Sequence, residues 1–216
     1  MKKLIEYMSE GKLHWDQVYR AKSPEQMSWT QAVPQTSLDL IRNLEIPKDA
    51  RIVDIGGGDS KLVDFLLADG YEDITVLDIS DKALNKAKKR LGSKAAKVTW
   101  ITSDIIHFSP EGAYDLWHDR AVFHFLTTQE QIETYIHIAV GSIRRYLVMG
   151  TFSEQGPDKC SGLPIKKYSK DELQLTFVKD FNVTACILED HRTPFDTLQN
   201  FVFCSFEKKM NNSLLQ

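Results

Sequence analysis

The chain has 216 residues, of which 42% are hydrophobic and 26% charged, and its formal net charge is −3. This length suits one α/β domain with a substantial core, and the composition excludes a disordered chain. A small negative charge disfavours a sequence-independent nucleic-acid binder, whose affinity comes from basic contacts with phosphates.

The first 47 residues are polar with scattered aromatic side chains, and they predict short helices that form a lid segment before the main domain. One of these helices is expected over residues 36–44, and Pro47 stops it. Residues 48–209 are predicted to form the main domain, and residues 210–216 a frayed tail.

From residue 51 onward, apolar strands alternate with amphipathic helices. Five short apolar runs predict strands, at residues 51–55, 74–77, 97–101, 114–117 and 143–150. Apolar residues at helical spacing predict helices at residues 60–68, 81–91 and 129–140. Such alternation predicts a mainly parallel sheet with right-handed crossovers.

Several helix ends carry recognisable signals. Gly70 lies where a helix C-terminal glycine belongs, and Ser80 can cap the helix at 81–91. Thr127 and Glu130 match a capping box at the start of the helix at 129–140.

The C-terminal part begins with a long loop, residues 151–168, that is rich in Gly, Pro and Ser. Ser169 and Glu172 repeat the capping-box pattern before a short helix. Two strands follow, at residues 182–189 and 198–206, with no helix between them. They predict a hairpin whose last strand runs antiparallel to the rest of the sheet.

The strongest motif lies between the first strand and its helix, in the run Val53-Asp54-Ile55-Gly56-Gly57-Gly58-Asp59-Ser60. Glycines allow a tight turn and a close backbone approach to a ligand. The dinucleotide pattern Gly-x-Gly-x-x-Gly fails because Lys61 occupies its third glycine. Asp54 and Asp59 would repel a pyrophosphate, whereas Asp54 suits a cation such as the ammonium of an amino-acid cofactor.

Three successive strands each end in an aspartate. Asp78, followed by Ile79, lies 20 residues after Gly58, the offset of an acid that accepts hydrogen bonds from ribose hydroxyls. Asp104 and Ile105 follow the third strand, where a carboxylate can accept from an adenine amino group and an apolar side chain can pack on its ring. Each aspartate alone is typical of a turn or a helix cap. Together with Asp54 they predict an adenosine-type ligand.

The stretch from Ile52 to Gly150 resembles a class I, seven-stranded methyltransferase dependent on S-adenosylmethionine, with Ser60 in place of a common third glycine. The resemblance implies a Rossmann-like α/β sheet of order 3-2-1-4-5-7-6, with strand 7 antiparallel and helices on both faces. It also implies that S-adenosylmethionine contacts Asp54, Gly56, Gly58, Asp78, Ile79, Asp104 and Ile105.

The N-terminal motif His14-Trp15-Asp16-Gln17-Val18-Tyr19, followed by Ser28-Trp29, resembles the start of the methyltransferase-like lysine methyltransferases. The resemblance implies that Trp15, Tyr19 and Trp29 help to enclose the cofactor, whose sulfonium cation is attracted to aromatic faces. The alternative is that these side chains only pack the lid onto the domain.

The fourth strand is followed by a segment that, in the family, lines the meeting point of methyl donor and acceptor. We expect Asp119 to act in catalysis, by orienting an acceptor amine or accepting its proton. His118 is expected to contact cofactor or acceptor and is a second candidate for the base. Arg120 is expected to form a local salt bridge and His124 to be structural. The Asn-Pro-Pro-aromatic motif of base-modifying enzymes is absent, which argues against a nucleic-acid substrate.

The loop at 151–168 is expected to help form the acceptor pocket, with Glu154, Lys159 and Cys160 as candidate contacts. The predicted function is in-line transfer of the sulfonium methyl group to a nitrogen, oxygen or sulfur acceptor on a small molecule or protein. The alternatives are a protein-lysine methyltransferase, a non-catalytic S-adenosylmethionine-binding module and an NAD-dependent oxidoreductase.

The remaining expectations concern location and bound metals. Cys160, Cys186 and Cys204 are widely spaced and form no zinc pattern, so free thiols are expected, with a catalytic thiol less favoured. No metal site is predicted. An apolar signal sequence and a bilayer-length stretch are both lacking, so we expect a cytoplasmic protein without a membrane partner. The sequence does not indicate an oligomeric state.

Overall fold

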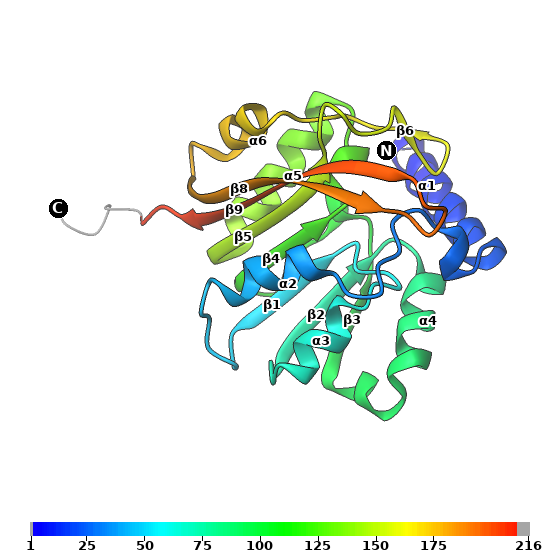
Figure 1. Cartoon of the computed structure of the whole chain (residues 1–216), viewed down its shortest axis with the longest axis horizontal. Coiled ribbons are helices and arrows are strands. Elements are labelled where there is room, and N and C mark those ends of the chain that lie inside the picture. The colour runs from blue at the N-terminus through cyan, green and yellow to red at the C-terminus, as the bar shows by residue number, and fades with distance from the viewer. Residues whose placement is uncertain (1, 211–216) are drawn as a thin grey trace.

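A computed structural model describes residues 2–210, and Figure 1 shows a twisted sheet with helices on both faces. The sheet has the order β3-β2-β1-β4-β5-β9-β8. Its strands are β1 (Arg51–Ile55), β2 (Asp73–Asp78), β3 (Val98–Thr102), β4 (Tyr114–Arg120), β5 (Ile143–Phe152), β8 (Phe181–Arg192) and β9 (Leu198–Lys208). Strands β1 to β5 pair in parallel, while β9 is antiparallel to both its neighbours. The predicted strand order and the antiparallel seventh strand are confirmed.

Alternate residues of the central strands face two separate hydrophobic cores. Ile52 packs with α2 (Gln35–Arg42), α3 (Leu62–Ala68) and α4 (Asp81–Leu91). Its neighbour Val53 packs on the opposite face, with α5 (Gln129–Ser142) and α6 (Lys170–Phe177). Because both faces are covered, the strands are apolar at consecutive positions, as in other parallel sheets.

Most of the predicted helix ends are confirmed. The Ser80 hydroxyl accepts from the Ala83 N–H at the start of α4, and Ser169 caps α6 in a capping box. Gly70 has a φ of +88°, the left-handed conformation expected after a helix. The capping box of α5 was predicted one residue too early, because the pair is Thr128 and Gln131.

The N-terminal segment differs from the short helices predicted. Residues Lys2–Ala21 form one helix, α1, and a 3₁₀ turn at Pro24–Gln26 follows it. Lys12 bridges Asp16 on its own helix, at 2.7 Å, and Asp81 at the start of α4. These contacts hold α1 against α4 at the carboxyl edge of the sheet (Figure 1). Of the predicted tail, only Met210 lies within the described residues, and it is exposed.

The long loop after β5 contains an unpredicted hairpin. Its strands are β6 (Lys159–Cys160) and β7 (Leu163–Pro164). The connecting residues, Ser161 and Gly162, have φ values of +51° and +81°. Positive φ at both central positions is the geometry of the tightest hairpin turn.

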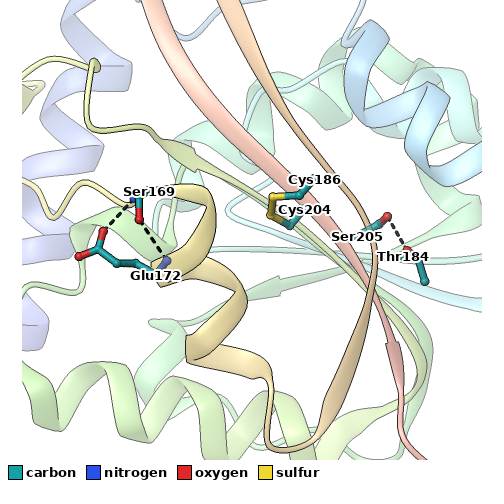
Figure 2. The surroundings of a disulfide bond; sticks show 6 residues. All are labelled: Ser169, Glu172, Thr184, Cys186, Cys204 and Ser205. Carbon is teal, nitrogen blue, oxygen red and sulfur yellow. Dashed lines mark hydrogen bonds between the residues drawn. A yellow bond between two sulfur atoms is a disulfide. The ribbon is translucent and has the colours of Figure 1, made fainter.

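The cysteine prediction was wrong for two of the three residues. Cys186 on β8 and Cys204 on β9 are register partners, their Cα atoms lie 4.1 Å apart, and they form a disulfide (Figure 2). The hydrogen bond between the hydroxyls of Thr184 and Ser205, 2.7 Å long, lies beside it. Strand pairing brings together residues 18 apart, which spacing alone did not reveal. Cys160 is free and buried.

Candidate active site

A cavity of about 930 Å³ lies at the carboxyl ends of the central strands. Its walls come from the turns after β1, β2, β3 and β4, from α1 and the segment that follows it, and from the β6–β7 hairpin. All the predicted cofactor-binding residues except Gly58 line it, namely Trp15, Tyr19, Trp29, Asp54, Gly56, Asp78, Ile79, Asp104, Ile105 and His118.

The glycine turn after β1 has no room for side chains. Gly56 and Gly58 have φ values of +65° and +45°. A Cβ on Gly58 would come within 2.8 Å of both the Asp78 carboxylate and the Tyr19 hydroxyl. Gly58 therefore lies between the lid and the end of β2, and a larger residue would push them apart.

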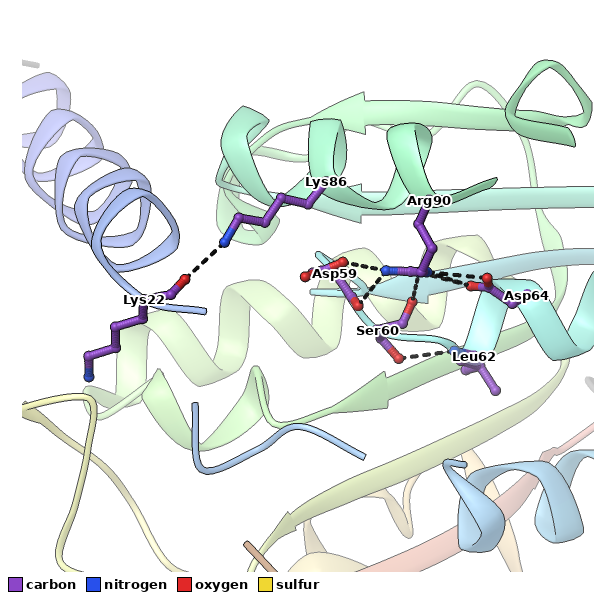
Figure 3. A network of polar contacts seen from close by, with 7 residues as sticks. All are labelled: Lys22, Asp59, Ser60, Leu62, Asp64, Lys86 and Arg90. Carbon is purple, nitrogen blue, oxygen red and sulfur yellow. Dashed lines mark hydrogen bonds and ion pairs between the residues drawn. The ribbon is translucent and has the colours of Figure 1, made fainter. Parts of the chain in front are cut away.

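Arg90 of α4 holds this turn in place (Figure 3). Its guanidinium donates to the Ser60 carbonyl at 2.7 Å and to the Asp64 carboxylate at 2.8 Å, and it also pairs with Asp59. Asp59 therefore has a counter-ion within the protein. In the same view the Lys86 ammonium donates to the Lys22 carbonyl at 3.0 Å, which ties α4 to the end of the lid helix.

The side chains of Ser37, Asp54 and His118 form a buried hydrogen-bonded chain. Parallel pairing of β1 and β4 places Asp54 beside His118, and Asp54 Oδ1 lies 2.7 Å from His118 Nδ1. The other ring nitrogen, Nε2, lies 2.9 Å from the Ser37 hydroxyl of α2. The carboxylate can only accept, so Nδ1 donates to it, and in the neutral ring Nε2 accepts from Ser37. Neither nitrogen of His118 is left free.

Asp78 is buried at the tip of β2, where its carboxylate accepts from the Ser80 N–H at 2.7 Å. Burial raises the pKa of Asp78 to about 7, although the Ser80 N–H opposes this rise. The Ser80 hydroxyl donates to Asp16 of α1 at 2.6 Å, so the lid and the end of β2 are linked.

Asp104 occupies the corresponding position after β3. Its carboxylate accepts from the Ile106 N–H at 3.2 Å, and burial raises its pKa. Ile105, the next residue, is buried, and both it and Ile79 after β2 line the cavity. The cavity wall therefore contains the acceptor and the two apolar side chains from which the sequence predicts an adenine site.

Aromatic side chains of the lid form one cluster. Trp15 lies 5.8 Å from Trp29, 5.2 Å from Phe125 and 6.4 Å from Tyr19, measured between ring centres. All four residues also line the cavity. The rings therefore both pack the lid onto the domain and present faces to the cavity, so the two alternatives weighed from the sequence are compatible. His14 lines the cavity too, and its buried Nε2 has no hydrogen-bond partner among the described residues.

Asp119 is not brought to the cavity. It is fully buried on the other face of the sheet, where it accepts from the Tyr135 hydroxyl at 2.7 Å and from the Val122 N–H at 3.0 Å. Burial raises its pKa to about 6, and these donors oppose the rise. Because side chains alternate along a strand, His118 faces the cavity and Asp119 faces away. This placement argues against the catalytic role predicted for Asp119.

Residues at the end of β4, directly after it and in the hairpin complete the cavity. Arg120 lines it and forms no salt bridge within the described part of the chain, contrary to the local ion pair predicted. Ala121, also in the wall, has a φ of +75°, which is strained for a residue with a side chain. Cys160 contributes to the wall, whereas Glu154 and Lys159 are exposed and do not.

His124, expected to be structural, is fully buried and stacks on Phe152 with ring centres 4.5 Å apart. Burial lowers its pKa to about 3 and so keeps the ring neutral.

Sequence reasoning missed Ser37, Arg90 and the free nitrogen of His14. Ser37 and His118 are 81 residues apart, and Arg90 reaches back 31 residues to Asp59, so only the folded chain brings them together. Capping residues and basic helix faces are too common in sequences to single them out.

Residues 2–210 contain no group of three or more His, Cys, Asp or Glu side chains arranged to hold a metal ion. Within the same range, no helix combines the length and apolar character needed to cross a membrane.

Comparison with known proteins identifies the domain that carries this cavity. Residues 52–144 match the family model described as a methyltransferase domain, and this range contains the glycine turn and all three strand-end aspartates. Over this segment the chain is similar to a methyltransferase domain, and its sheet has the strand order of the class I methyltransferase fold. Solved structures similar to this chain contain S-adenosylmethionine or S-adenosyl-L-homocysteine, and the strand order is the one that the resemblance implied.

Similar proteins act on different acceptors. The chain is 38% identical over 82 residues to malonyl-[acyl-carrier protein] O-methyltransferase of Anoxybacillus flavithermus, covering 37% of this chain and 30% of that protein. It is 24% identical over 121 residues to the mouse eEF1A lysine and N-terminal methyltransferase. This alignment covers 55% of this chain and 17% of the mouse protein. The aligned regions span about a third or less of the curated relatives.

A solved structure shares the fold over most of both chains. The N-methyltransferase NodS from Bradyrhizobium japonicum, in complex with S-adenosyl-L-homocysteine, superposes with a TM-score of 0.69 at 17% identity. The alignment covers 90% of this chain and 98% of NodS.

Proposed function

We propose that this protein is an S-adenosylmethionine-dependent methyltransferase that acts on a small-molecule acceptor. The observation that carries the proposal is the clustering of Asp54, Asp78 and Asp104 in one cavity, inside the segment matched to a methyltransferase domain. The names of its relatives include malonyl-[acyl-carrier protein] and the lysine and N-terminus of eEF1A as acceptors. We favour the small molecule because α1 and the β6–β7 hairpin both contribute walls to the cavity.

The residues that line the cavity suit each chemical group of the cofactor. Asp78 would accept from the ribose hydroxyls, and Asp104 from the adenine amino group, with Ile79 and Ile105 packed against the ring. The tight turn at Gly56 and Gly58 would let the methionine part lie against the backbone.

Asp54 and the lid would bind the charged groups of the cofactor. The Asp54 carboxylate attracts the ammonium, and its hydrogen bond with His118 fixes its orientation. The rings of Trp15, Tyr19 and Trp29 provide faces for the sulfonium cation. A pyrophosphate would instead meet the buried Asp54 carboxylate, which disfavours the NAD-dependent alternative.

The cofactor supplies a methyl group on a positively charged sulfur, which leaves as a neutral thioether. The protein's part is to hold the acceptor in line with that bond and to exclude water, and positioning of this kind contributes about 7–11 kcal/mol. His118 is hydrogen-bonded on both ring nitrogens and Asp119 faces away, so we assign neither as a general base. His14 is the imidazole of the cavity that keeps an unpaired nitrogen.

Calorimetric titration tests the cofactor assignment. We expect S-adenosylhomocysteine to bind the wild-type protein and NAD to leave no measurable heat. Asp78→Asn should weaken the binding at least tenfold, since one ribose-binding acceptor is lost. Asp73→Asn, at the exposed start of the same strand, is the matched control and should bind like the wild type. Equal binding by both variants would exclude the proposed site.

The acceptor class is tested with labelled S-adenosylmethionine and a cell extract separated by molecular size. Label in the small-molecule fraction is the expected result. Label confined to proteins would favour the lysine-methyltransferase alternative. Tight cofactor binding without transfer to either fraction would favour a non-catalytic binding module.

A further inference from the structure

The guanidinium of Arg120 presents two unused donors in the cavity. Arg120 is the last residue of β4, and its Nη1 donates to the Trp29 carbonyl at 3.0 Å. Its Nε and Nη2 are buried and have no hydrogen-bond partner among the described residues. In an arginine these two nitrogens lie on the same side of the planar group, so their N–H bonds form a parallel fork.

Arg120 is also a buried cation without a counter-ion. Burial lowers its pKa to about 10, so the guanidinium stays protonated at neutral pH. Among the described residues no carboxylate lies within 4.0 Å of it, since Arg120 takes part in none of the ion pairs. Glu189 and Asp54 attract it from beyond that distance. A buried charge that lacks a partner is costly, which favours a partner supplied by a ligand.

The surroundings of Arg120 combine groups assigned to the cofactor with elements after β5, since Trp29 accepts from it and Asp54 attracts its charge. Its guanidinium carbon lies 4.9 Å from the ring centre of Phe201 on β9, and the Cys160 thiol of the hairpin is close enough to interact with its charge. These elements follow β5 and lie outside the matched methyltransferase segment at 52–144. The groups assigned to the nucleoside, Asp78 and Asp104, come instead from the ends of β2 and β3.

Resting on the function proposed above, we propose that Arg120 binds a carboxylate of the methyl acceptor through the paired N–H groups of Nε and Nη2. Two parallel donors match the two oxygens of a carboxylate, and such bidentate pairs give both affinity and orientation. Trp29 fixes the guanidinium from the opposite edge, so the fork is oriented before the ligand arrives. The acceptor is thus a small molecule that carries a carboxylate. This carboxylate is either separate from the methylated group or is itself the group that is methylated.

The test measures binding of matched acids and amides to protein saturated with S-adenosylhomocysteine. The probes are benzoate with benzamide and phenylacetate with phenylacetamide, followed by ligand-detected NMR. In the wild type we expect at least one acid to bind about tenfold or more tightly than its amide, the effect of a charge-assisted pair. The preference should vanish in Arg120→Gln and be reduced in Arg120→Lys, which keeps the charge but loses the fork. Arg145→Gln, on the exposed part of β5, is the matched control and should keep it.

Three outcomes would overturn the proposal. One is that no acid binds the wild type more tightly than its amide, and another is that the acid preference survives in Arg120→Gln. The third is that Arg120→Gln weakens S-adenosylhomocysteine itself at least tenfold, which would assign the fork to the cofactor's own carboxylate. Thermal midpoints identify a variant that fails to fold, and the more conservative Arg120→Lys then decides. Failure of cofactor binding by the wild type would instead refute the proposed function, and the acid and amide pairs can still be compared in the ligand-free protein.

Discussion

At the scale of single residues, Asp78 links cofactor binding to pH. Burial favours its protonated form in the ligand-free protein and raises its pKa from 3.8 to about 7, whereas hydrogen bonds from two ribose hydroxyls favour the ionised carboxylate, which accepts through both oxygens. Its contribution to folding stability is therefore fully present below about pH 3.8 and is lost as the pH rises through about 7. Cofactor binding should change in the opposite direction.

We predict that the affinity for S-adenosylhomocysteine rises with pH through about 7 and then levels off. Below that pH it should fall by up to roughly tenfold per pH unit, because one proton must be released on binding. Calorimetry between pH 5.5 and 8.5, a range of roughly three units around this pKa, measures the effect. Asp78→Asn should bind weakly at every pH, and Asp73→Asn should follow the wild type. A flat profile for the wild type would mean that Asp78 does not bind in its ionised form.

We assign Asp119 a different role, that of a buried carboxylate that stabilises the fold. The Trp117 indole N–H donates to the Tyr135 hydroxyl at 3.0 Å, and that hydroxyl donates to Asp119 at 2.7 Å. Tyr135→Phe leaves the carboxylate with one donor fewer, so the free energy of unfolding should fall by about 1–3 kcal/mol. Cofactor affinity should stay within about twofold, a change of less than 0.5 kcal/mol.

Urea unfolding and calorimetry on the same samples check both effects. Tyr146→Phe, whose hydroxyl accepts from Arg145 on the surface, is the matched control and should change neither. If Asp119→Asn kept full stability and cofactor affinity but lost methyl transfer, the catalytic role inferred from the sequence would be restored.

At the scale of secondary structure, local signals explain what could be predicted. Helix α4 runs over Asp81–Leu91, the bounds predicted, because Ser80 caps its start and Gly92 follows its end. The start of α5 was misplaced because Thr127 and Thr128 both resemble caps, and only the extended backbone of Thr128 satisfies the geometry. The β6–β7 hairpin was missed because strands of two residues have no periodicity to detect.

In the site, too, features set by local sequence could be predicted and features set by strand pairing could not. The glycine turn and the three aspartates were predictable because parallel strands place their carboxyl ends at one edge of the sheet. The direction of the Asp119 side chain was not predicted. Strand alternation fixes that direction once His118 is known to face the cavity. The pairing of His118 with Asp54 depends on the register of β1 against β4, which no local pattern specifies.

At the scale of the whole molecule, both cores hold the strands whose tips are assigned to the cofactor. Strands β1 and β2 contribute alternate residues to each core, as Ile52 and Val53 show. The β8–β9 hairpin closes the other end of the sheet, and its disulfide joins the two strands near the middle of their pairing. Cytosolic thiols are normally kept reduced, so a disulfide disfavours the cytoplasmic location expected from the sequence. That location stays a prediction.

The disulfide gives the last prediction. Cys186→Ser combined with Cys204→Ser should lower the free energy of unfolding by about 3 kcal/mol, the value for a closed loop of this length. Affinity for S-adenosylhomocysteine should not change, because neither cysteine lines the cavity. Cys160→Ser is the control for the unfolding measurement alone, since that thiol is buried and unpaired but lines the cavity.

Thiol titration of the denatured protein establishes the premise. One reactive thiol is expected without reductant and three after reduction, since Cys160 is free and the other two are paired. Three thiols before reduction would show that the strands pair without the covalent bond in solution. In that case the double serine variant should unfold at the same urea concentration as the wild type, and the objection to a reducing compartment would be removed.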